Sequence, residues 1–87
     1  MSPKTPPKVE LTIPILQDME LAATNTAEVV AKHMGLSEEK TAEISMALIE
    51  ATINAFEHSE SKSSNVEIHF VIQGDMLIIK VSDHGKG

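Results

Sequence analysis

Residues 66–83 read VEIHFVIQGDMLIIKVSD, and this stretch decides the fold. Apolar and polar side chains alternate on both sides of Gly74-Asp75, and a two-residue turn containing glycine commonly joins antiparallel strands. The resulting register predicts four pairs on one face of the hairpin: Ile72 with Leu77, Phe70 with Ile79, Ile68 with Val81, and Val66 with Asp83. Because a register fixes the face of every side chain, Asp83 should share the apolar face that packs against the rest of the domain.

The segment before the hairpin predicts one more strand and two helices. Val9 to Ile13 alternate like a half-buried strand, which Pro14 should end because proline lacks a backbone N–H. A first helix is expected over about 15–34, where apolar residues recur three or four positions apart: Leu16, Met19, Ala23, Ala27, Val30 and Met34.

Local signals mark the ends of both helices. Gly35 occupies the position at which glycine commonly ends a helix. Ser37 is expected to cap a second helix that runs to about Glu57. Residues 1–8 are rich in proline and predict a disordered tail, so the domain should comprise residues 9–87. We expect an α/β (α+β) two-layer sandwich, with a mainly antiparallel sheet covered on one face by two helices.

The composition excludes several classes of function. Seven lysines, no arginine and thirteen acidic residues give a net charge of −6, so the chain lacks the positive surface that binds nucleic acid. No apolar run approaches the ~20 residues that cross a membrane. The absence of cysteine fits a reducing compartment. We therefore expect a soluble cytoplasmic domain that binds neither nucleic acid nor membrane.

The second helix carries an unusual polar ridge. Glu50, Asn54 and His58 recur every four residues on a helix that is otherwise mostly apolar, so their side chains project from one side. This pattern has two interpretations: the ridge is simply the solvated side of an amphipathic helix, or its polar groups serve a binding site. Asp83 favours the second interpretation, because the hairpin register brings it to the same layer.

The last five residues read DHGKG and follow directly after the last predicted strand. An acid followed by alternating glycines is weak evidence alone, since glycine is common in turns. Together with the preceding helix, whose motif is Glu50-x-x-x-Asn54-Ala55, it is much more specific. The combination resembles the Bergerat-fold (GHKL) ATP-binding domain shared by gyrase, heat-shock chaperone, histidine kinase and MutL proteins. Within that superfamily, residues 44–58 and 83–87 look most like the bacterial anti-sigma-factor serine/threonine kinases.

The resemblance implies roles for the ridge on the second helix. Glu50 would be the general base, and Asn54 would be the ligand of an Mg²⁺ ion bound to the ATP phosphates. His58 matches a position near those phosphates. The residue types suit this chemistry, because a carboxylate can accept a proton from the attacking hydroxyl and an amide oxygen suits Mg²⁺.

The glycine box, residues 83–87, would hold the base of the nucleotide. By the same resemblance, Asp83 would accept a hydrogen bond from the adenine amino group, and Gly85 and Gly87 would begin the lid over the nucleotide. An acceptor at this position would distinguish adenine from guanine, which carries a carbonyl there.

The resemblance implies the ATP-binding region of a serine/threonine kinase that sequesters a sigma factor and phosphorylates an anti-anti-sigma protein. Two rivals are the catalytic domain of a sensor histidine kinase and a non-enzymatic binding or dimerisation module. The lid and later strands of the family would follow Gly87, so we expect a truncated Bergerat domain that is inactive alone. An open sheet edge and exposed apolar surface predict a homodimer.

Overall fold

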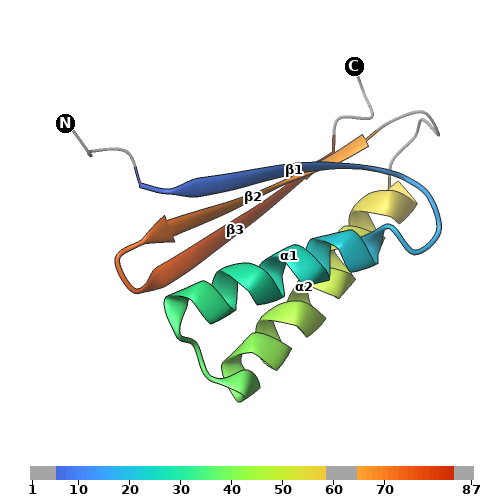
Figure 1. Ribbon diagram of the computed structural model, residues 1–87. Helices are drawn as coiled ribbons and strands as arrows, with labels where there is room; N and C mark the ends of the chain where they lie inside the picture. Colours follow the sequence, from blue (N-terminus) through green and yellow to red (C-terminus); the bar gives the residue numbers. More distant parts are fainter. Residues whose placement is uncertain (1–5, 59–64, 84–87) are drawn as a thin grey trace.

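Three antiparallel strands and two helices form two layers (Figure 1). The computed structural model describes residues 6–58 and 65–83. In chain order the elements are β1 (Lys8–Pro14), α1 (Glu20–Met34), α2 (Glu38–His58), β2 (Asn65–Gln73) and β3 (Met76–Asp83). The strand order is β1-β2-β3, and both helices lie on one face of the sheet. The expected α+β two-layer sandwich is therefore confirmed.

The hairpin of β2 and β3 has the expected register. The pairs are Ile72 with Leu77, Phe70 with Ile79, Ile68 with Val81, and Val66 with Asp83. The turn between the strands contains Gly74 at a φ of 65°, a left-handed conformation that glycine adopts without a steric cost. A short turn and strict alternation are local features, so they were readable from the sequence.

Strand β1 pairs with the other edge of β2 and extends one residue beyond each predicted end. It runs from Lys8 to Pro14. Proline is tolerated because β1 is an edge strand, where a backbone N–H can be missing without breaking the sheet. Ordered contacts begin before the strand, since the Pro7 carbonyl accepts a hydrogen bond from the Ile72 N–H at 3.0 Å. The remainder of the predicted tail, residues 1–5, lies outside the described residues.

The first helix begins at Glu20, later than the predicted start near residue 15. Asp18 has a φ of 71°, which a right-handed helix cannot contain, and hydrogen-bonded turns occupy the preceding residues. The Leu16 N–H donates to the Pro14 carbonyl at 2.9 Å, and the Met19 N–H donates to the Leu16 carbonyl at 3.2 Å. Leu16 is consequently 60% exposed, so its placement on the buried stripe was wrong.

The connection between the helices confirms both predicted caps. Gly35 has a φ of 76°, and the N–H groups of Gly35 and Leu36 donate to carbonyls in the last turn of α1. This is the usual glycine-terminated helix end. Ser37 Oγ then accepts a hydrogen bond from the Lys40 N–H at 3.1 Å, which caps the amino end of α2. The two helices thus reverse direction within three residues.

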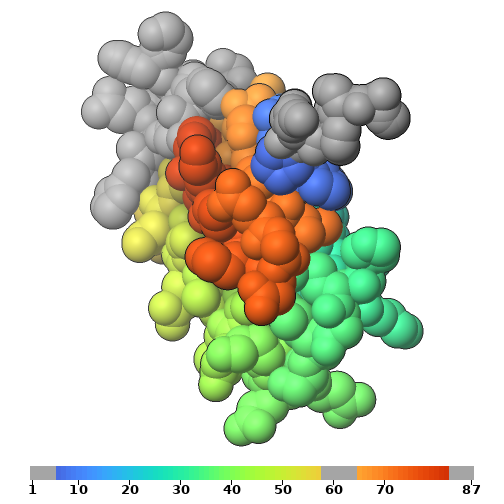
Figure 2. All heavy atoms as spheres, turned by 90° about the vertical axis from the view of Figure 1, so that its left-hand side faces the viewer, coloured from blue at the N-terminus to red at the C-terminus, as the bar shows by residue number. Residues whose placement is uncertain are grey.

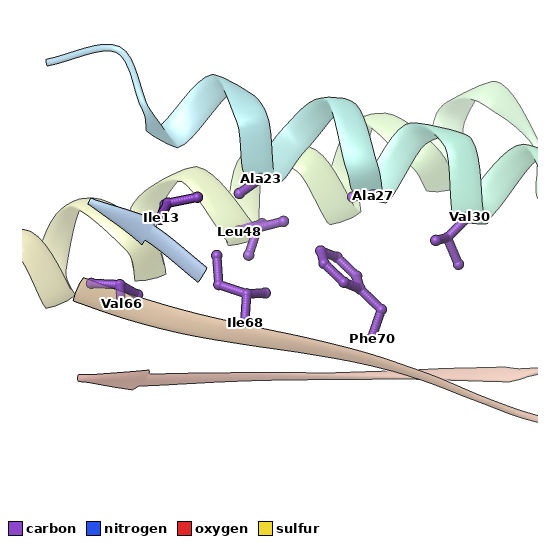
Figure 3. Close-up of a cluster of buried hydrophobic side chains, with 8 residues drawn as sticks. All are labelled: Ile13, Ala23, Ala27, Val30, Leu48, Val66, Ile68 and Phe70. Atoms are coloured by element: carbon purple, nitrogen blue, oxygen red, sulfur yellow. The ribbon is translucent and has the colours of Figure 1, made fainter. Parts of the chain in front are cut away.

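The hydrophobic core lies between the sheet and the helices (Figure 3). Phe70, Ile68 and Val66 of β2 are fully buried. The whole cluster comprises Ile13, Ala23, Ala27, Val30, Leu48, Val66, Ile68 and Phe70. Three of its eight members belong to the central strand β2, which explains why this strand organises the other elements.

Small side chains line the buried side of α1, and two threonines are buried on the helices. Ala23, Ala27 and Ala31 are inaccessible to solvent, so the backbone of α1 can approach its neighbours closely. The Thr24 hydroxyl donates to the Leu21 carbonyl at 3.2 Å. The Thr52 hydroxyl on α2 is also buried but has no hydrogen-bond partner among the described residues. A buried hydroxyl without a partner is destabilising.

Replacing the Thr52 hydroxyl by a methyl group should stabilise the fold. Thr52→Val keeps the shape and removes the unsatisfied group, so the free energy of unfolding should rise by about 1–3 kcal/mol. Urea denaturation followed by circular dichroism measures the change. Thr24→Val is the matched control, because it removes a hydroxyl that is hydrogen-bonded and should not stabilise. Equal destabilisation by both substitutions would show that Thr52 has a partner.

Candidate functional site

The predicted polar ridge lies on the exposed side of α2. Glu50 and Asn54 are both exposed, while Leu48 and Thr52 of the same helix are buried. Among the described residues, no side-chain hydrogen bond or ion pair engages Glu50 or Asn54. Exposure alone agrees with a solvated helix face as well as with a binding site. The surroundings of the ridge are therefore the deciding evidence.

An apolar groove lies beside the ridge, between α2 and β3. Its volume is about 240 Å³, and its lining consists of Ile44, Ala47, Leu48, Ala51, Ile79 and Val81. At 3.6 residues per turn, Asn54 lies within about 20° of Ala47 around the helix axis. The amide of Asn54 is thus attached at the rim of the groove, and Glu50 is attached farther toward solvent. Figure 2 shows β3 lying above α2 on one flank of the molecule.

The last residue of β3 lies at the same end of the molecule as the last turn of α2. The two elements run in the same general direction (Figure 1), so the ends at His58 and Asp83 both lie toward that side. The backbone of Asp83 pairs with Val66, as the hairpin register predicted. Of His58 and Asp83 only the backbone is described, and Gly85 and Gly87 lie outside the described residues.

Sequence reasoning missed the residues that line the groove. Ala47 and Ala51 are one helical turn apart, and Ile79 and Val81 are alternate residues of β3. Ile79 and Val81 were predicted only as part of the apolar face of the hairpin, and no role was predicted for Ala47 and Ala51. A signal was nevertheless present, because alanines at i and i+4 on the same sector as Asn54 leave space beside a helix where larger residues would fill it. The groove forms only where these alanines meet β3.

Asn54 offers a single oxygen donor, which suits a metal ion that is held mainly by waters and phosphate oxygens. Among residues 6–58 and 65–83, no group of three or more His, Cys, Asp or Glu side chains could hold a metal ion. Mg²⁺ usually keeps several waters and takes one or two protein ligands together with phosphate oxygens. The exposed Asn54 amide can supply such a single oxygen ligand.

The described helices include none that is long and apolar enough to cross a lipid bilayer.

Comparison with known proteins agrees with this geometry. The sequence profile of one family, described as histidine kinase-like ATPase domain, matches residues 14–87. Neither a curated protein nor a solved structure shows significant similarity to the chain. The match spans both helices, the hairpin and the glycine box, which are the parts that carry the resemblance in the sequence. An ATPase domain implies ATP binding. The chain therefore belongs to the histidine kinase-like ATPase domain family.

Proposed function

We propose that the chain is the ATP-binding region of a serine/threonine protein kinase like the bacterial anti-sigma-factor kinases. The observation that supports the ATP site is the groove between α2 and β3, and the helical period places Asn54 on the same side of α2 as Ala47 of its lining. The groove includes Val81, two residues before the end of β3 at Asp83. An apolar slot with a few polar groups at its margin is the usual form of a small-molecule site.

The adenine ring would enter the groove between the two alanines of α2 and the two apolar residues of β3. Ala47 and Ala51 leave the space, and Ile79 and Val81 supply an apolar floor. Asp83 would accept a hydrogen bond from the adenine amino group. An adenine ring buries apolar surface there, and the hydrogen bond to a charged acceptor adds selectivity over guanine.

The phosphates would extend from the groove toward the polar ridge, with Gly85 and Gly87 as the start of the lid and His58 near the phosphates. The Asn54 amide oxygen would bind Mg²⁺, which when bound neutralises phosphate charge. Glu50 lies one helical turn before Asn54, close enough for both to act at one site. Its carboxylate would accept the proton of the attacking hydroxyl. Positioning and charge neutralisation account for most of the catalysis of phosphoryl transfer.

The finer assignment rests on the resemblance of residues 44–58 and 83–87 to the anti-sigma-factor kinases. On this proposal a sigma factor and an anti-anti-sigma protein are the partners, the protein acts in the cytoplasm, and two copies form a homodimer. A sensor histidine kinase would attach phosphate to histidine, and such phosphate is labile in acid, whereas phosphoserine and phosphothreonine survive acid. The acid stability of the product therefore distinguishes the two kinds of kinase.

The Asp83→Asn substitution should weaken adenine nucleotide binding while the fold is retained. The loss of one charged acceptor corresponds to ~1.5–3 kcal/mol, or about a ten- to hundredfold rise in Kd. Titration of a fluorescent ATP analogue measures this, with Asp75→Asn in the hairpin turn as the matched control. Unchanged affinity of the Asp83 variant would refute its adenine role. No binding to the unmodified chain at millimolar ATP would favour the non-enzymatic module.

The Asn54→Ala substitution should reduce the contribution of Mg²⁺ to ATP affinity. Removing the amide leaves the adenine contacts intact, so affinity in EDTA should stay within about twofold, whereas affinity in Mg²⁺ should fall about tenfold. Parallel titrations with and without Mg²⁺ measure the difference. Asn25→Ala on the exposed side of α1 is the control. Equal losses in both buffers would mean that Asn54 does not act through the metal.

The Glu50→Gln substitution should separate binding from catalysis. Glutamine keeps the size of the side chain and cannot act as a base at neutral pH, so ATP affinity should change less than twofold, whereas phosphate transfer by the kinase should fall at least a hundredfold. Transfer of radiolabelled phosphate from ATP measures the second effect. Glu43→Gln, elsewhere on α2, should leave both quantities unchanged. Transfer at the unsubstituted rate would make Glu50 a solvated surface residue.

A further inference from the structure

A second groove lies between the two helices, and we call it the helical groove. Its volume is about 540 Å³, and its lining residues belong to α1, α2 and the connection between them. Ala42 of the helical groove and Ala51 of the groove between α2 and β3 are nine residues apart. At 3.6 residues per turn they lie about 180° apart around the helix axis. The two grooves are therefore on opposite sides of α2.

The helical groove exposes neighbouring apolar side chains. Leu36, Ala42 and Met46 line it, and Met46 is 65% exposed. Val29 is 69% exposed and lies three residues before Lys32 of the lining, so both are on the same side of α1. Exposed apolar groups that gather in a groove with a polar rim are typical of a surface that binds a partner.

Acidic side chains dominate the surroundings of the helical groove. The two helices carry seven Glu and two Lys residues, and one of the lysines, Lys40, lies 3.9 Å from Glu43. Glu28 and Glu38 line the groove, and neither forms an ion pair with a described residue. The carboxyl end of α1 adjoins the amino end of α2, so the two helix dipoles largely cancel there. The side chains therefore give the rim a net negative charge.

We propose that the helical groove binds a basic amphipathic helix of a partner protein. The apolar face of such a helix would cover Ala42 and Met46, while its Lys or Arg side chains would reach Glu28 and Glu38. An amphipathic helix that lies in an apolar groove is a recurring mode of recognition. Opposite charges at the rim speed the encounter and fix the orientation.

The walls of the groove favour a helix over an extended peptide. The backbone N–H and C=O groups along α1 and α2 are hydrogen-bonded within each helix. An extended peptide would thus find no backbone partners in the walls, and its own backbone groups would lose water on binding. A helix satisfies its backbone groups internally, so it can present side chains alone to the groove.

The charge of the rim favours a basic partner over a second copy of the chain. The helices of a second copy would bring the same excess of Glu, so contact between the two helical layers would be repulsive. The whole chain has a net charge of −6, which also repels nucleic acid and anionic membrane surfaces. A positively charged segment gains the same attraction that these candidates lack.

The size of the groove predicts a weak, reversible contact. Its lining on α2 extends from Glu38 to Met46, which corresponds to about two helical turns. An interface of this length belongs to the small class that is typical of transient complexes. We therefore expect a Kd in the micromolar range.

Three synthetic peptides of about 18 residues, or roughly five helical turns, test the proposal on the full chain. The first carries leucine on one face of its helix and lysine on the other. The second has glutamate in place of every lysine, and the third keeps the lysines but has central prolines that break the helix. Fluorescence anisotropy at about 0.15 M salt measures Kd. The lysine peptide should bind in the micromolar range, and the other two should bind at least about tenfold more weakly.

A matched pair of methionine variants locates the bound peptide. Met46→Gln should raise the Kd of the lysine peptide about fivefold, because glutamine keeps the length of the side chain and loses its apolar surface. Met76→Gln should leave Kd within about twofold. Met76 is similarly exposed, at 59%, but it alternates with Leu77 and so lies on the outer face of the sheet, which points away from the helices.

A matched pair of charge variants tests the acidic rim. The combined change Glu28→Gln and Glu38→Gln should raise the Kd of the lysine peptide about fivefold, since two attractive contacts are lost. The combined change Asp75→Asn and Glu57→Gln removes the same charge from the hairpin turn and the far end of α2. It should leave Kd within about twofold.

The possible outcomes separate this proposal from its alternatives. No binding of the lysine peptide, equal binding of the glutamate or proline peptide, or a Kd unchanged by Met46→Gln would each overturn it. Sedimentation equilibrium tests the remaining occupant: weaker self-association of the Met46→Gln variant would mean that a second copy covers the groove. ATP affinity should stay within about twofold in all these variants, because the helical groove lies opposite the groove between α2 and β3. The two proposals can therefore fail separately.

Discussion

Burial of the inner face of β2 is the constraint on which the rest of the structure depends. Val66, Ile68 and Phe70 are fully buried, and their side chains lie between the sheet and the two helices (Figure 3). A shift of one residue in register would turn all three to the outer face and bring charged residues into the core. The hydrophobic effect therefore fixes the register, and the register fixes where β3 ends and which residues line the groove.

One side of helix α2 packs in the hydrophobic core, and the adjacent side borders the groove. Leu48 contributes to the core and also borders the groove. Ala47 and Ala51 border the groove without filling it. Because alanine buries little apolar surface, these positions contribute less to stability than leucine would. We interpret this loss as the cost of a binding groove, which agrees with membership of an ATPase family.

The two faces of the sheet differ in chemistry. The inner face supports the helices and the nucleotide groove that we propose, whereas the outer face carries Glu10 of β1 and Lys80 of β3 on either side of His69 of β2. Successive residues of β3 alternate between the two faces: Ile79 and Val81 line the groove, and Ile78 and Lys80 lie on the outer face.

The sequence by itself determined the elements whose causes are local: the hairpin register, the glycine that ends α1, the Ser37 cap of α2 and the spacing of Glu50 and Asn54. Each depends on residues a few positions apart. The sequence misplaced the start of α1, because apolar spacing does not reveal the left-handed backbone of Asp18. Only the tertiary structure showed the groove, since Ala47 and Ile79 lie far apart in the chain and become neighbours when α2 packs against β3. The opposite charges across the outer face also became visible only after β1 had paired with β2, because no local pattern connects Glu10 to Lys80.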